Sequence, residues 1–176
     1  CFANTKERVN TFSEEVSLKA NILSLGHNKP WKLFALNIIW LFGGYVLQSS
    51  AVIYYFKYVV QNNSLVQVVA TITTLVPVVT NLCAPFLVKR TYKKNLMVVG
   101  NIGHIAGLLI IFFGGTNVPV LVVGAVIAAA GYGLKGSMHF AMQPDPVDYG
   151  EWKTGYRTEG LVNSACSFGY KIGNGI

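Results

Sequence analysis

The 176-residue chain is 52% hydrophobic and only 12% charged, with a mean hydropathy of +0.46. A soluble domain carries about 25% charged residues, so this composition excludes an ordinary soluble protein and indicates a chain that lies mainly in lipid. The net charge of +7 does not indicate nucleic-acid binding, because the charges stand in short clusters between long uncharged runs instead of along one basic face.

The long uncharged runs predict membrane spans in chain order. A span needs about 20 mostly apolar residues, and residues 1–29 are too polar to form one, so we expect a polar lead-in there and a bundle over 30–176. The predicted spans are about 33–56, 65–88, 95–113, 119–142 and 159–176. We therefore expect an all-α, polytopic transmembrane helix bundle of about five spans, belonging to a longer protein.

Loop charge predicts the orientation of these spans. The first, third and fifth loops contain clusters of Lys and Arg, whereas the second contains only Lys57 and the fourth contains none. Cytoplasmic loops carry an excess of Lys and Arg, so these three loops are expected to be cytoplasmic. A multi-pass protein of the cell membrane, specifically a bacterial inner membrane, is expected, with the lipid bilayer as its first partner.

The fifth predicted span contains a charge at membrane depth. Lys171 lies 12 residues after Glu159, about 18 Å along a helix, and the hydrocarbon core is about 30 Å thick. A charge near the midplane normally faces a cavity or a partner. The polar stripe around it, together with one amide of the first span, gives the predicted substrate-binding set: Lys171, Ser167, Asn163, Asn174 and Gln48. Amides on the first two spans suit either a polyhydroxylated ligand or hydrogen bonds between helices.

A dense charged segment follows the fourth span, where Pro144 and Pro146 are expected to end the helix and begin a loop. The predicted cytoplasmic gate consists of Asp145, Asp148, Glu151, Lys153, Arg157 and Glu159. Such a network can hold helix ends together in one conformation and release them in another. Carboxylates also suit hard cations, but the interspersed basic residues favour a charge network, so no metal site is predicted.

Residues 131–136 spell G-x-G-x-x-G, a pattern that binds dinucleotides in another context. The preceding apolar run is much longer than a strand, and no acidic residue follows at the required distance to hold a ribose. No organic cofactor is therefore predicted, and the glycines are expected to serve close helix packing.

The sequence Asp-Pro-Val-Asp-Tyr-Gly-Glu-Trp-Lys-Thr-Gly-Tyr-Arg-Thr-Glu-Gly at 145–160 resembles the signature of the glycoside–pentoside–hexuronide:cation symporters, in the major facilitator superfamily. The resemblance implies a C-terminal-half fragment containing helices seven to eleven of twelve, with residues 1–29 in the central cytoplasmic loop. It also implies an N-terminal half as partner, which carries the acidic cation ligands.

The same resemblance assigns roles to individual residues. Lys171 matches the membrane lysine of helix eleven at the sugar and cation sites, and Ser167 matches a sugar-side position. Asp145, Asp148 and Arg157 match charged gate residues. The fourth span lacks the sugar-facing tryptophan of the family's melibiose permease and has Lys135 and His139 instead. Because of this departure, glucuronides, xylosides and other glycosides are also candidate substrates, and Lys135 suggests an anionic sugar.

The expected function is secondary active transport of a glycoside or hexuronide, coupled to Na⁺ or H⁺, by alternating access. A lysolipid carrier of the same superfamily is the close alternative. A channel is possible on composition alone. A polytopic membrane enzyme is the third class, but the spans contain no clustered nucleophile, base or metal constellation, so no enzyme is expected.

Overall fold

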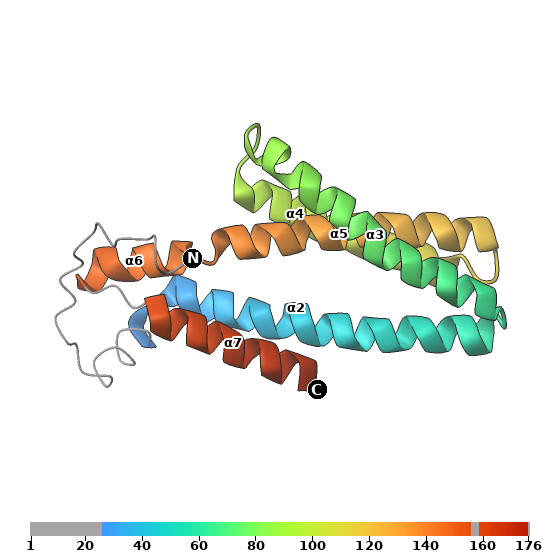
Figure 1. Ribbon diagram of the computed structural model, residues 1–176, viewed down its shortest axis with the longest axis horizontal. Coiled ribbons are helices and arrows are strands. Elements are labelled where there is room, and N and C mark those ends of the chain that lie inside the picture. Colours follow the sequence, from blue (N-terminus) through green and yellow to red (C-terminus); the bar gives the residue numbers. More distant parts are fainter. Residues whose placement is uncertain (1–25, 156–158, 176) are drawn as a thin grey trace, which may run out of the picture.

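The computed structural model describes residues 26–155 and 159–175, and every regular element in that part of the chain is helical (Figure 1). The elements are α2 Lys29–Tyr54, the π-helix η2 Tyr55–Val59, α3 Asn63–Val88, α4 Lys93–Phe113, α5 Val118–Met142, α6 Asp145–Thr154 and α7 Glu159–Gly175. Four stretches are long and apolar enough to cross a membrane: Lys29–Val59, Ser64–Val88, Lys93–Phe113 and Val118–Thr154. The all-α prediction is confirmed. The first four predicted spans each overlap one of these stretches, whereas the fifth, 159–176, overlaps α7, a helix of 17 residues that is not among the four.

Asparagine caps set the start of the first two long helices. Asn28 accepts a hydrogen bond from the backbone N–H of Trp31, at 3.0 Å, and Pro30 occupies the first turn of α2. Asn62 accepts from the backbone N–H groups of Ser64 and Leu65 at the start of α3. Both arrangements satisfy backbone donors that have no partner inside the helix.

The turn between α2 and α3 lies beside the turn between α4 and α5. The backbone N–H of Val60 donates to the carbonyl oxygen of Tyr55 at 3.2 Å, which widens the last turn of α2 into η2. The Tyr55 hydroxyl donates to the carbonyl oxygen of Gly115 at 2.6 Å. The two loops that are poor in basic residues therefore meet at one end of the bundle, as their charges predicted.

The helices form two closely packed groups. In the first, α4 and α5 pack through small residues: a Cβ added to Gly107 would lie 2.3 Å from the backbone nitrogen of Ala128. α3 joins this group along α5, where a Cβ on Gly133 would lie 2.8 Å from the Cα of Pro77. Such close approach favours van der Waals contact between backbones. An added Cβ at these glycines would therefore force the backbones of this group apart.

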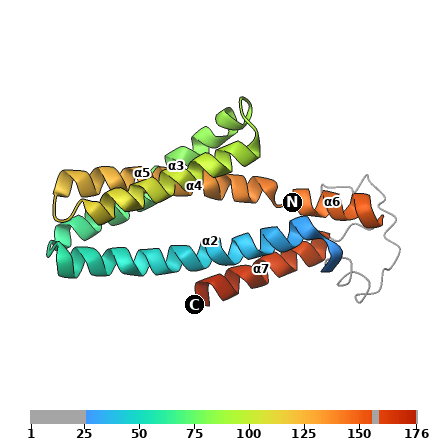
Figure 2. The ribbon, with the colours of Figure 1, turned by 180° about the vertical axis from the view of Figure 1, so that it is seen from behind.

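The second group consists of α2 and α7, which lie side by side and run in the same direction (Figures 1 and 2). A Cβ on Gly169 would lie 3.1 Å from Ile38, and one on Gly173 would lie 3.1 Å from the backbone nitrogen of Gly43. The buried face of α7 is therefore its Val162, Cys166, Gly169 and Gly173 face. Its polar residues are left on other sides of the helix.

One prediction about the fold is wrong: the segment after α5 is a helix, α6, and not a loop. Pro146 is tolerated because it lies in the first turn, where its missing N–H has no helical partner to lose. Asp145 and Asp148 in that turn also interact favourably with the positive end of the helix. Gly155 ends the helix in the left-handed conformation, with φ of 74°. The predicted lead-in of residues 1–29 lies mostly outside the described residues.

Candidate functional site

The polar stripe predicted on the fifth span lies along α7, away from its buried face. Ser167, Lys171 and Asn174 are all exposed. The Ser167 hydroxyl donates to the carbonyl oxygen of Asn163 at 2.9 Å, and the Asn174 amide donates to that of Tyr170 at 2.9 Å. These bonds within α7 leave the stripe as a free polar face of the described chain.

Lys171 is the charge of this stripe, and it lies beside the middle of α2. Gly173, two residues later, contacts Phe42 and Gly43 near the midpoint of that helix. Within the described residues, Lys171 makes no hydrogen bond or ion pair. Residues 29–142 contain no Asp or Glu, so the helices of this range offer Lys171 no acidic partner.

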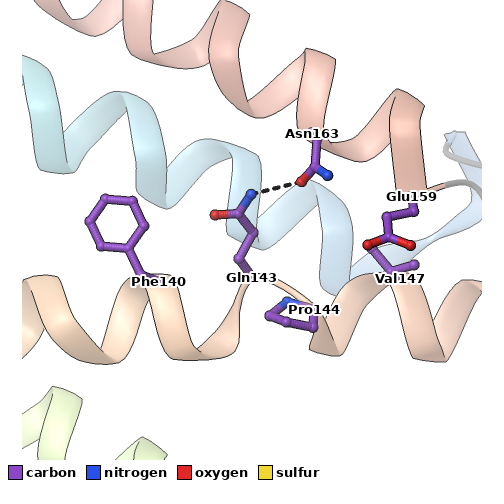
Figure 3. Close-up of a pocket in the computed structure, with 6 residues that line it drawn as sticks. All are labelled: Phe140, Gln143, Pro144, Val147, Glu159 and Asn163. Atoms are coloured by element: carbon purple, nitrogen blue, oxygen red, sulfur yellow. Dashed lines mark hydrogen bonds between the residues drawn. The ribbon is translucent and has the colours of Figure 1, made fainter. Parts of the chain in front are cut away.

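Asn163 takes part in a contact between α5 and α7. The Gln143 amide nitrogen donates to the Asn163 side-chain oxygen at 2.8 Å, and Figure 3 shows the two side chains pointing toward each other. They line a pocket of about 130 Å³ between the end of α5, the start of α6 and the first turn of α7, together with Phe140, Pro144, Val147 and Glu159. Gln143 was not predicted, although an amide just before the Pro144 break was a usable signal.

Gln48 is the predicted substrate residue that the structure does not bring to the others. It is half-buried on α2. Ile38 of α2 contacts Gly169 and Gly43 contacts Gly173, so the last described turn of α7 ends before it reaches Gln48. Any shared cavity between Gln48 and Lys171 would therefore extend beyond the end of α7.

The described gate residues lie on α6 and at the start of α7, at the end of the bundle where α2 and α4 begin. Lys93 at the start of α4 donates to the Asp145 carboxylate at 3.2 Å and to the carbonyl oxygen of Ala141 at 3.0 Å. The Lys153 ammonium donates to the carbonyl oxygen of His27 at 3.5 Å. The Lys93–Asp145 contact joins the start of α4 to the start of α6. The Lys153–His27 contact joins the end of α6 to the residue before the Asn28 cap of α2.

The remaining gate residues are placed by the same elements. Asp148 and Glu151 follow on α6, and Glu159 begins α7 and lines the pocket of Figure 3. Arg157 lies outside the described residues. In the described part of the chain, no three His, Cys, Asp or Glu residues gather as a metal site.

Asn28 also holds this end of the bundle, a role that was not predicted from the sequence. Its side chain is buried, with an exposed fraction of 4%, and its Nδ2 donates to the carbonyl oxygen of Pro146 at 2.8 Å. Gly150 lies so close that an added Cβ would be 3.1 Å from the same nitrogen. An asparagine before Lys-Pro signals a helix cap, but the contact with α6 depends on tertiary structure.

Aromatic rings and amides fill the seam between the two helix groups. Tyr45 of α2 stacks on Tyr132 of α5, with centroids 4.8 Å apart, and the Lys135 ammonium lies 5.4 Å from the Tyr132 centroid. His139 of α5 stacks on Phe34 of α2, at 4.5 Å and 3° between planes. The seam thus carries one cation and several hydrogen-bonding rings.

Comparison with known proteins decides the family. The model of the family described as "MFS/sugar transport protein" matches residues 1–176. The chain belongs to the MFS/sugar transport protein family. This confirms the resemblance expected from the 145–160 signature. The chain is therefore a segment of a multi-pass membrane protein of the cell membrane, in a family of transport proteins and not of enzymes.

Three proteins that are similar to this chain are named for three different sugars. The chain is 38% identical to the isoprimeverose transporter of Lactiplantibacillus pentosus, over 99% of the chain and 37% of that protein. It is 30% identical to the glucuronide carrier protein homolog of Escherichia coli, over 100% of the chain and 39% of that protein. It is 29% identical to a putative sulfoquinovose importer of Salmonella typhimurium, over 98% of the chain and 37% of that protein. The chain therefore spans little more than a third of these relatives.

Proposed function

We propose that the full-length protein containing this chain is a secondary active transporter that takes up a glycoside or hexuronide together with Na⁺ or H⁺. The observation that carries the proposal is Lys171, an exposed cation beside the middle of α2 with no acidic partner in the described spans. A charge at such depth is stable only beside a cavity or a partner. The sugar-related names of the relatives support a polyhydroxylated substrate.

In this proposal, Lys171, Ser167, Asn163 and Asn174 face a cavity shared with the N-terminal half. Their hydroxyl, amide and ammonium groups suit sugar hydroxyls, and Gln48 contributes from α2 farther along the same cavity. Lys171 either donates to the substrate or balances carboxylates of the other half. The coupling cation would bind to those carboxylates, because residues 29–142 contain none.

The charged end around α6 would close the cytoplasmic side. Lys93–Asp145 and Asn28–Pro146 connect α6 and the preceding corner to α4 and α2. Each exposed ion pair contributes less than about 1 kcal/mol, which suits contacts that must break in every cycle. Several such contacts together shift a two-state equilibrium by a few kcal/mol.

The decisive experiment is uptake of a labelled glycoside panel by vesicles containing the full-length protein, with and without an imposed Na⁺ or H⁺ gradient. Accumulation of one glycoside above its external concentration, only when one gradient is present, is the expected result and names both substrate and ion. Folded protein that moves no sugar but exchanges lysophospholipid would favour the lipid carrier instead.

A further inference from the structure

Two polar atoms in the seam between the helix groups have no hydrogen-bond partner. His139 is 1% exposed, and its Nδ1 lies 3.2 Å from the Asn37 side-chain oxygen. Because that oxygen is an acceptor, Nδ1 carries the hydrogen, and Nε2 is left as an acceptor. His139 Nε2 is buried with no partner, and so is the hydroxyl oxygen of Tyr170 on α7.

The two unsatisfied atoms belong to one ring cluster. Phe42 of α2 lies 6.4 Å from His139 and 4.0 Å from Tyr170, between ring centroids. Phe140 of α5 lies 5.7 Å from His139 and 6.3 Å from Tyr170. Apolar rings from two helices, α2 and α5, therefore lie against both members of the pair, and these rings offer neither atom a hydrogen bond.

Buried polar side-chain atoms are nearly always hydrogen-bonded, and an exception calls for a missing partner. The partner that fits here must donate to the imidazole nitrogen and bind the phenol hydroxyl, whose rings share Phe42 and Phe140 as neighbours. Neighbouring hydroxyls of a sugar ring provide both functions, since each donates and accepts. The ring's C–H face also suits an aromatic wall, and ligand sites commonly combine such walls with a few convergent polar groups.

The cluster lies between the two helix groups. α4 with α5, and α2 with α7, approach through glycines with their backbones in close contact. Across the seam, side-chain rings and the His139–Asn37 contact join α2 to α5 around the cluster, and an apolar cluster that includes Phe56, Leu121 and Ala125 joins η2 to α5 farther along. Rings that separate by a small shift of either group would expose both polar atoms to a ligand.

We propose that His139 Nε2 and the Tyr170 hydroxyl form a hydroxyl-binding subsite for a sugar, with Phe42 covering the apolar face of the sugar ring. Asn37 is the positioning residue, because its oxygen fixes the hydrogen on Nδ1 and leaves Nε2 free to accept. The inference rests on the proposed function and adds to it two residues that the 163–174 stripe does not include.

The test uses the purified full-length protein and measures binding of isoprimeverose and of methyl β-D-glucuronide. Tyr170→Phe removes only the unpartnered oxygen and keeps the ring, so we expect the empty protein to unfold at the same or a higher temperature. We expect the same variant to bind the better probe at least tenfold more weakly. A purely structural role would leave this binding unchanged. Tyr92→Phe is the matched control, since Tyr92 is 82% exposed between α3 and α4.

A second pair of variants addresses His139. We expect His139→Leu to lose binding at least tenfold, and His139→Gln, which keeps an acceptor, to recover most of it. Deoxy analogues of the probe should identify the hydroxyl whose removal costs affinity in the wild type but not in Tyr170→Phe.

Binding by Tyr170→Phe and His139→Leu within twofold of the wild type would mean that the two atoms bind water only, and would overturn the subsite while leaving the proposed function intact. A folded wild type that binds neither probe would overturn both.

Discussion

Asn28 and Pro146 lie 118 residues apart in the chain, and a buried hydrogen bond of 2.8 Å joins the Asn28 side chain to the Pro146 carbonyl oxygen. The same side chain caps α2 through the backbone N–H of Trp31. One asparagine therefore fixes the start of α2 and the position of α6 against it. This double role couples the structure of the first span to the element that carries most of the predicted gate.

We predict that Asn28→Ala destabilises the full-length protein more than Asn62→Ala does. Both substitutions remove a helix cap, which contributes about 1 kcal/mol. Only Asn28→Ala also removes the buried hydrogen bond to the Pro146 carbonyl oxygen, a further loss of about 0.5–1.5 kcal/mol. Thermal or denaturant unfolding of the two variants in detergent measures the difference. Equal loss in both would show that the α6 contact contributes nothing.

We predict that Gly107→Ala destabilises the α4–α5 group by about 1–3 kcal/mol, because overpacking forces the backbones apart. An added Cβ would lie 2.3 Å from the Ala128 nitrogen. Gly136→Ala is the control in α5, since its Cβ would meet nothing within 4 Å. That control should be neutral or stabilise the helix by up to about 1 kcal/mol. Unfolding curves that rank the two variants in the opposite order would contradict the close packing.

Lys171→Ala in the full-length protein should abolish uphill accumulation of the transported sugar, because the cavity loses its central cation. Uptake by energised vesicles at matched expression is the measurement. Lys89→Ala, at the end of α3 on the membrane surface, should accumulate normally. Normal accumulation by Lys171→Ala would remove this lysine from the proposed site.

Lys135→Gln should weaken uptake of a sugar acid by about tenfold or more and leave a neutral glycoside within about twofold. Hydrogen bonds to charged groups contribute about 1.5–3 kcal/mol, and the Lys135 ammonium over Tyr132 has no acidic partner in the described residues. Lys57→Gln is a matched control. The Lys57 ammonium also lies 5.4 Å from a tyrosine ring centroid, that of Tyr58, but in η2, at the end of the bundle away from α6. Competition between methyl β-D-glucuronide and methyl β-D-glucoside gives the ratio of sugar-acid uptake to neutral-glycoside uptake. An unchanged ratio would exclude Lys135 from substrate selection.

Lys93→Asp and Asp145→Lys should each slow transport about fivefold, the effect of about 1 kcal/mol on a conformational equilibrium. Neither should unfold the protein, because the pair is half-exposed. The double variant restores opposite charges and should recover part of the rate in initial-uptake assays. Lys94→Asp, an exposed neighbour, is the control. A double variant slower than both single variants would show that the ion pair is not the relevant contact.

The positions of the membrane helices could be predicted from the sequence because each depends on a local property. An uncharged run of about 20 residues requires a helix in lipid, since no other partner is available for its backbone groups. The basic loops could be placed at one end for a similar reason. The prediction failed at α6, where two prolines and six charged residues suggested a loop. Proline at a first turn, acidic residues at the helix start and Gly155 at its end make that segment helical.

The sequence by itself determined the family, the all-α fold, the positions of the spans and the polar stripe that carries Lys171. These features follow from composition and from spacing along one helix. Only the tertiary structure decided that Asn28 holds α6, that Gln143 meets Asn163, and that His139 and Tyr170 share one ring cluster. These pairs lie on different helices, and the glycine contacts between backbones, which set the register of each helix pair, determine which side chains meet.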